Sequence, residues 1–184
     1  MTTPFSIRKA TLADIGLIGR LADVCFRDTY KEILSAEQLE YMMNWMYSAE
    51  SLERQIAAEG HVYFIAEVEG EAVGYVSVQP EGQAEDGLPL WHLQKIYVLP
   101  DCQTDGVGKR LFLHVLDYVS KTVGEPCRVE LNVNRNNKAV GFYEHMGMRK
   151  LRQGDFPIGN GYYMNDYIMG LDIAARNGDN PENN

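Results

Sequence analysis

The spacing of apolar positions along the chain predicts an alternation of strands and helices. Runs rich in Val, Ile, Tyr and Phe alternate with segments in which apolar residues recur every three or four positions. The predicted strands cover residues 5–10, 61–69, 72–79, 90–98, 127–133, 148–151 and 162–171, and the predicted helices cover residues 11–26, 35–46, 51–59, 107–123 and 136–146. This order predicts an α+β fold, with a mixed, mostly antiparallel sheet flanked by helices in a single domain.

Local signals indicate where the helices begin and end. Thr11 is suited to cap the first helix, and Ser35-Ala-Glu-Gln38 has the pattern of a capping box. Gly124 is expected to end the long helix. We expect a polar, acidic loop over residues 80–89, and a polar tail over residues 174–184 that follows a domain of residues 1–173.

The length and charge of the chain exclude several classes of protein. The 184 residues suffice for one domain whose core needs no disulfide or metal. Seventeen Lys and Arg against 26 Asp and Glu give a net charge of −9, which repels phosphate backbones and anionic lipid. Because no dense basic run offsets this charge, we expect no nucleic-acid partner and no membrane partner.

The cysteines and the absence of long apolar runs indicate a compartment. Cys25, Cys102 and Cys127 are too few and too widely spaced for a disulfide framework or a CxxC metal site. No segment reaches the ~18 apolar residues of a membrane span, and the first residues lack the order of a secretory signal. We expect a soluble, cytoplasmic protein with reduced thiols and no bound metal, either monomeric or homodimeric.

The most informative segment is Gln103-Thr-Asp-Gly106-Val-Gly108-Lys109, between the strand ending at Val98 and the long helix. Glycines allow a sharp turn close to a ligand, and a helix start presents unpaired N–H groups and a positive dipole end. The segment therefore has the composition of a pyrophosphate site. It matches neither the P-loop pattern nor G-x-G-x-x-G, and by itself it could equally be a tight structural turn.

A second informative segment spans residues 131–148. A strand gives way to an Asn-rich turn, then to a short helix that contains Phe142-Tyr143 and ends at Gly147. Alone, this pattern is also that of an Asn-capped helix with a buried aromatic pair. Its combination with the glycine loop favours a binding site over a purely structural role.

Together these segments resemble the GNAT superfamily of acetyl-CoA-dependent N-acetyltransferases. The resemblance lies in Ile96-Tyr-Val98 with Pro100, in the Q-x-x-G-x-G of residues 103–108, and in the N-x-x-A-x-x-F-Y pattern of residues 136–143 followed by EHMGM. The ending GYYMNDYIMGL, residues 161–171, is similar to the last strand of a bacterial branch that includes polyamine acetyltransferases. The resemblance covers about residues 5–172.

The resemblance implies roles for individual residues in binding acetyl-CoA. Ile96 and Val98 would lie beside the pantetheine arm, where their strand separates from its neighbour. Asn134 and Asn136 would contact the pantetheine or phosphate end of the cofactor. The amides of the glycine loop would hold the pyrophosphate, with Lys109 adding positive charge; these residues are Gln103, Thr104, Asp105, Gly106, Val107 and Gly108. Two departures stand out: Thr104 replaces a frequent glycine, and the charge of Asp105 would weaken binding unless it points outward.

Acyl transfer by direct attack needs an oxyanion donor, an acid for the leaving thiolate and a base for the amine. The Val98 N–H suits the oxyanion, and Tyr143 is our candidate acid near the thioester sulfur; the alternative is that Tyr143 only packs. Of His92 and Gln94, which strand alternation puts on one face, His92 alone can act as a base. A lone strand histidine is often structural, however, and many family members use water chains or a carboxylate.

The substrate follows less directly from the sequence. Aromatic and methionine residues between positions 26 and 47 either line an acceptor pocket, with Phe26 and Tyr30 as substrate-binding residues, or form plain core. We expect acetyl transfer to a primary amine of a small molecule, such as a polyamine or an aminated metabolite, which the acidic composition favours. The alternatives are a protein N-terminal or lysine N-acetyltransferase, which would need an open groove, and an acyl-CoA-binding module without turnover.

Overall fold

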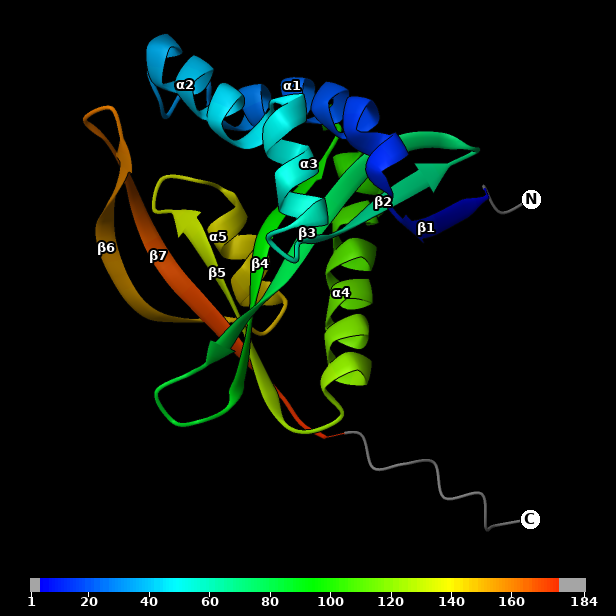
Figure 1. Cartoon of the computed structure of the whole chain (residues 1–184), viewed down its shortest axis with the longest axis vertical. Helices are drawn as coiled ribbons and strands as arrows, with labels where there is room; N and C mark the ends of the chain where they lie inside the picture. Colours follow the sequence, from blue (N-terminus) through cyan, green and yellow to red (C-terminus); the bar gives the residue numbers. More distant parts are fainter. Residues whose placement is uncertain (1–3, 176–184) are drawn as a thin grey trace.

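A computed structural model, which describes residues 4–175, contains a seven-stranded sheet in the order β1-β2-β3-β4-β5-β7-β6 (Figure 1). Every neighbouring pair is antiparallel except β4 and β5, which run parallel. The strands are β1 (Phe5–Lys9), β2 (Val62–Val68), β3 (Glu71–Gln83), β4 (Pro89–Val98), β5 (Cys127–Asn134), β6 (Arg149–Gly159) and β7 (Tyr162–Ile173). The predicted α+β fold with a mostly antiparallel sheet is confirmed.

Helices cover both faces of the sheet and enclose two apolar cores. One core joins α1, α2 and α3, which gather at the top of Figure 1, to side chains such as Ile65 and Tyr75. The other joins α4 and α5 to the opposite face through Phe64 and Val76, as strand alternation requires. The helices are α1 (Ile15–Tyr30), α2 (Ala36–Tyr47), α3 (Ala49–Ala57), α4 (Val107–Val123) and α5 (Ala139–His145), with short 3₁₀ helices at Leu12–Asp14 and Pro100–Asp105.

Several boundaries differ from the prediction. Thr11 caps the first 3₁₀ turn, and α1 continues to Tyr30, whose ring is buried in the core. β3 and β6 extend through polar residues for which the pattern predicted no strand, because pairing with β4 and β7 supplies their backbone bonds. Ser35 accepts from the Gln38 amide at 3.2 Å, but the Gln38 side chain donates to the Tyr163 carbonyl instead of completing a capping box.

The last strand ends where the predicted polar tail begins. The predicted domain boundary at residue 173 coincides with the end of β7, and residues 176–184 of the predicted tail lie outside the described residues. Within residues 4–175, no helix is long and apolar enough to cross a membrane.

Candidate active site

The sheet opens between its two parallel strands. β4 and β5 pair only from Leu90 to His92, so the rest of β4 has no partner on the β5 side. On the other side, β3 pairs along β4 up to Val98, and the Leu99 amide donates to the Val73 carbonyl at 2.8 Å. Because N–H groups alternate in direction along a strand, those of Ile96 and Val98 point into the opening.

A cleft of about 990 Å³ continues from this opening to the start of α4. Gly106 precedes the helix with φ +72°, a left-handed conformation that favours glycine. Gly108 also lines the cleft, where a Cβ would make ordinary contact with the Val98 side chain at 3.8 Å. The Gln103 side chain donates to the Val98 carbonyl at 3.3 Å and ties the loop to the strand. The first amides of α4 therefore stand at the end of an open strand edge.

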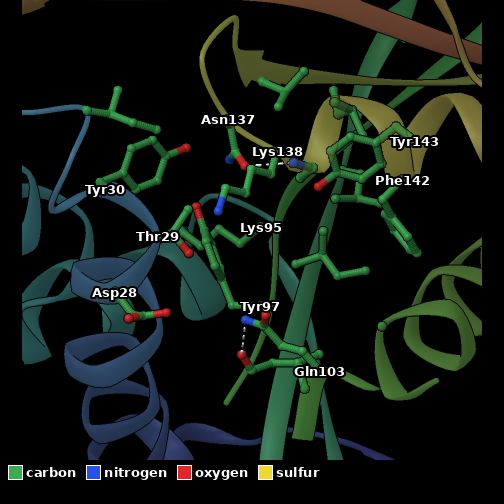
Figure 2. Close-up of a pocket in the computed structure, with 18 of the residues that line it drawn as sticks. Asp28, Thr29, Tyr30, Lys95, Tyr97, Gln103, Asn137, Lys138, Phe142 and Tyr143 are labelled. Carbon is green, nitrogen blue, oxygen red and sulfur yellow. Dashed lines mark hydrogen bonds between the residues drawn. The ribbon is translucent and has the colours of Figure 1, made fainter. Parts of the chain in front are cut away.

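Two tyrosines face each other across this cleft (Figure 2). Tyr143 of α5 is 7% exposed and contacts Phe112 and Phe142, and burial raises the pKa of its hydroxyl. Burial also raises the pKa of Tyr30, whose hydroxyl is hydrogen-bonded with Tyr97 and Asn137. Both phenols therefore keep their protons at neutral pH and can donate hydrogen bonds.

A second cavity of about 350 Å³ lies between α1, α2 and the strands β3 to β7. Most of the residues in its wall are aromatic or sulfur-containing. Its polar residues are His92, Glu81, Asn134 and Asp166, together with Gln94, Lys95 and Asn132, which also line the cleft. The two spaces share five lining residues, which are Tyr30, Gln94, Lys95, Tyr97 and Asn132. A ligand in the cleft and a ligand in the cavity would therefore meet at these residues.

The polar groups of the second cavity differ in how they are paired. His92 Nδ1 lies 3.0 Å from Glu81 Oε2, and this contact lowers the pKa of the Glu81 carboxyl. Asp166 accepts from the Asn132 side chain through Oδ2 at 3.4 Å, and burial raises the pKa of its carboxyl. The cavity thus contains one paired and one largely unpaired carboxylate.

A family model described as an acetyltransferase (GNAT) domain matches residues 30–162. The chain belongs to the GNAT acetyltransferase family. An uncharacterized N-acetyltransferase of Escherichia coli is 30% identical over 100 residues, which are 54% of this chain and 56% of that protein. The chain thus spans little more than half of that relative. A second uncharacterized N-acetyltransferase, from Bacillus subtilis, is 25% identical over 77% of this chain and 88% of its own length.

Solved GNAT structures share the fold at lower identity. The PaiA N-acetyltransferase of Thermoplasma acidophilum, in complex with coenzyme A, has a TM-score of 0.72 and 23% identity over 92% of this chain and 99% of its own. The ribosomal-protein-S18-alanine N-acetyltransferase of Escherichia coli has a TM-score of 0.68 at 17% identity, over 96% of this chain and 98% of its own. Mutant forms of the spermidine/spermine N-acetyltransferase of Vibrio cholerae have a TM-score of 0.62 at 19% identity, over 91% of this chain and 93% of theirs.

Acetyl-CoA is the cosubstrate that membership of the GNAT family implies, and the cleft of this chain fits that molecule. A pantetheine arm carries amide groups that can pair with the free edge of β4. A pyrophosphate requires N–H donors and positive potential, which the start of α4 supplies together with Lys109. Acetyl-CoA, when bound, supplies an activated thioester carbonyl.

Most of the residues predicted to bind the cofactor line the cleft. These are Ile96, Val98, Gln103, Gly106, Gly108, Lys109, Asn136 and Tyr143, together with the predicted substrate residue Tyr30. Thr104 and Asp105 are exposed and lie outside its lining, with the Thr104 hydroxyl 3.4 Å from the Asp105 carboxylate. The Val107 side chain is buried in the core. Asp105 is therefore a solvent-exposed carboxylate that does not line the cleft.

The remaining predicted residues lie in the second cavity rather than in the cleft. Phe26 and His92 line it, and so does Asn134, which was expected to contact the cofactor. Asn134 has a structural contact as well: its Oδ1 accepts a hydrogen bond from the Asn136 amide at 2.9 Å within the turn after β5. The structure thus separates the predicted residues into two groups that meet at Tyr30.

Sequence reasoning missed several polar residues of the site. Asn137 and Lys138 lie in the Asn-rich turn and line the cleft, so that turn was a usable signal. Asp166 interrupts an apolar face formed by Met164 and Ile168, which is also visible in the sequence. Lys95 is buried, and its Nζ donates to Gln55 Oε1 at 2.7 Å and to the Tyr63 hydroxyl at 2.8 Å.

Proposed function

We propose that this enzyme transfers the acetyl group of acetyl-CoA to a primary amine of a small cationic molecule that occupies the second cavity. The observation that carries the proposal is the junction of the two spaces at Tyr30, Gln94, Lys95, Tyr97 and Asn132. A thioester at the end of the cleft would meet an amine from the cavity at this junction. Holding the two reactants together in this way makes their reaction effectively unimolecular, which lowers the barrier to direct acyl transfer.

The cleft residues bind and orient the cosubstrate in this proposal. The free N–H group of Ile96 holds the arm along β4, and the amides of residues 103–108 with Lys109 hold the phosphates. Asn136 borders the same cleft at the turn after β5. The Val98 N–H donates to the oxygen that becomes negative as the amine attacks.

Tyr143 provides the proton for the departing sulfur. Its buried phenol stays neutral and lines the cleft opposite Tyr30 (Figure 2). A neutral phenol can hydrogen-bond to the sulfur as negative charge develops and can then transfer its proton. The arrangement needs no other acid near the thiolate.

His92 removes the proton of the amine. A primary amine with a pKa of ~10.4 is almost wholly protonated at neutral pH and cannot attack in that form. His92 lines the second cavity, and its contact with Glu81 holds the imidazole in one orientation. Phe26 and Tyr30 form the apolar wall against which the substrate lies.

Contacts between α2 and the β6–β7 hairpin favour a small acceptor over a protein segment. The Tyr41 hydroxyl donates to the Ile158 carbonyl at 2.8 Å, and the Gln38 side chain donates to the Tyr163 carbonyl at 3.2 Å. These bonds join α2 to the hairpin beside the cavity and leave less room there for an extended peptide. Structural neighbours are named for both substrate classes, spermidine and spermine in one and a ribosomal protein in another. The preference for a small acceptor therefore rests on the cavity and not on the neighbours.

A substrate panel tests the proposal. Acetyl-CoA-dependent thiol release would be measured with polyamines, diamines, amino acids, aminoglycosides and peptides with free N-termini, and the products identified by mass. We expect a gain of one acetyl group on a small cationic amine, with kcat/KM at least tenfold above that for any peptide. A peptide as the best substrate, or tight acetyl-CoA binding without turnover of any amine, would overturn the proposal.

A further inference from the structure

Asp166 lies on the face of β7 that borders the second cavity. It pairs in register with Asn134 of β5, and its neighbours on the same face, Met164 and Ile168, are apolar. The residue is 5% exposed and lines the cavity. Within residues 4–175, Asp166 Oδ1 is the buried side-chain oxygen or nitrogen that has no hydrogen-bond partner.

The cation whose charge acts on Asp166 does not satisfy this oxygen. Arg135 acts on Asp166 only through its charge, while its guanidinium donates to Asp155 Oδ1 at 2.7 Å and contacts the Gly154 carbonyl at 3.4 Å. The Asn132 side chain donates to the other oxygen of Asp166, at the long distance of 3.4 Å. A buried carboxylate oxygen without a donor is costly, and a ligand that supplies a donor recovers that cost on binding.

We propose that Asp166 binds a cationic nitrogen of the acceptor, and that the acceptor therefore carries a second ammonium besides the amine that is acetylated. This inference rests on the proposed function, because it assigns the second cavity to the acceptor. The aromatic wall supports it, since Phe26, Trp45, Tyr97 and Phe156 line the cavity and aromatic rings attract cations.

The chemistry of the reaction explains why the nitrogen at Asp166 is not the one that reacts. The reacting amine must lose its proton before attack, and a carboxylate bound to it would stabilise the charged form. A nitrogen that stays charged throughout gains from the same contact. His92, the proposed base, pairs with Glu130, four residues along β5 from the partner of Asp166, which is about 13 Å at 3.3 Å per residue. The two nitrogens would occupy different ends of the cavity.

A pair of matched amines tests the inference. We would compare kcat/KM for 1,6-diaminohexane and for heptylamine, which replaces one ammonium by a methyl group of similar size. The wild-type enzyme is expected to prefer the diamine by about 10–100-fold, as for a charge-assisted hydrogen bond. Asp166→Asn is expected to abolish this preference through a higher KM for the diamine, while heptylamine changes less than threefold.

Two further variants make the result specific. Asp155→Asn is the matched control, because it removes a carboxylate that Arg135 already binds outside the cavity lining, and it is expected to keep the diamine preference. Asp166→Glu retains the charge and is expected to recover part of the preference. The melting temperature of each variant confirms that it is folded.

The outcomes separate this inference from the proposed function. An Asp166→Asn enzyme that acetylates amines and still prefers the diamine would overturn the role of Asp166 and leave the proposed function intact. Failure of the wild type to acetylate either amine would count against the proposed function. In that case, diamine binding by calorimetry still tests Asp166: equal affinity of wild type and Asp166→Asn would overturn its role.

Discussion

Replacing the buried Lys95 by methionine is predicted to remove a pH-dependent loss of stability. The Lys95 side chain lies in a cage made by Gln55, Tyr47 and Tyr63, with Nζ 5.3 Å from the centre of each tyrosine ring. Desolvation lowers its pKa from the ordinary value of 10.5 to about 7. The folded protein therefore holds fewer protons at this site than the unfolded chain does between pH 7 and pH 10.5.

The magnitude follows from the two pKa values. Stability rises with pH wherever the unfolded state binds more protons, so this site destabilises the fold most below pH 7. A difference of 3.5 pKa units corresponds to a penalty of about 5 kcal/mol at low pH. Between pH 6 and pH 9, about 3 kcal/mol of that penalty is relieved. Lys95→Met removes the charge, and Gln55 Oε1 keeps the Tyr63 hydroxyl as its donor at 2.6 Å.

Urea unfolding of wild type and Lys95→Met at pH 6, 7, 8 and 9 measures this effect. We expect the difference in free energy of unfolding between the two proteins to shrink by about 3 kcal/mol from pH 6 to pH 9, with the variant relatively more stable at pH 6. Lys121→Met, which changes an exposed lysine of α4, serves as the control and should parallel the wild type. Parallel curves for wild type and Lys95→Met would refute the reasoning.

Two substitutions test the proposed acid and base. Tyr143→Phe is expected to lower kcat by about 10²-fold with an unchanged Kd for acetyl-CoA, and an unchanged kcat would exclude the acid role. His92→Gln is expected to lower kcat by about 10²-fold with an unchanged Kd for acetyl-CoA, because glutamine accepts no proton. An unchanged kcat in this variant would show that the base is another group.

The sequence predicted those parts of the fold and site that depend on local chemistry. The glycine loop, the Asn-rich turn and Tyr143 lie in two contiguous segments, and most of the residues expected to bind acetyl-CoA line one cleft. The long helix was predicted at its observed bounds because its apolar spacing and Gly124 are both local signals. Local signals also placed Ser35 correctly as a helix cap.

Features that depend on pairing between distant strands could not be predicted. β6 is exposed at most positions, so it shows no apolar alternation beyond its first residues. Asp166 reaches the cavity only through the register of β7 with β5. Lys95 follows a bulge: it pairs with Ser77 while Leu93 pairs with the adjacent Val78, so Gln94 has no partner on β3. Strict alternation would place Lys95 on the face of Trp91 and Leu93, whereas the bulge turns it to the opposite face, beside Gln55 and Tyr63.

The most direct test of the proposed function is a crystal structure of the enzyme with a bisubstrate analogue that joins coenzyme A to one nitrogen of a diamine. We predict that the pantetheine arm lies along β4 at Ile96 and Val98, with the linked nitrogen at the junction near Tyr30 and the free nitrogen at Asp166. A diamine portion that lies outside the second cavity, on the outer surface of the protein, would contradict the proposed function.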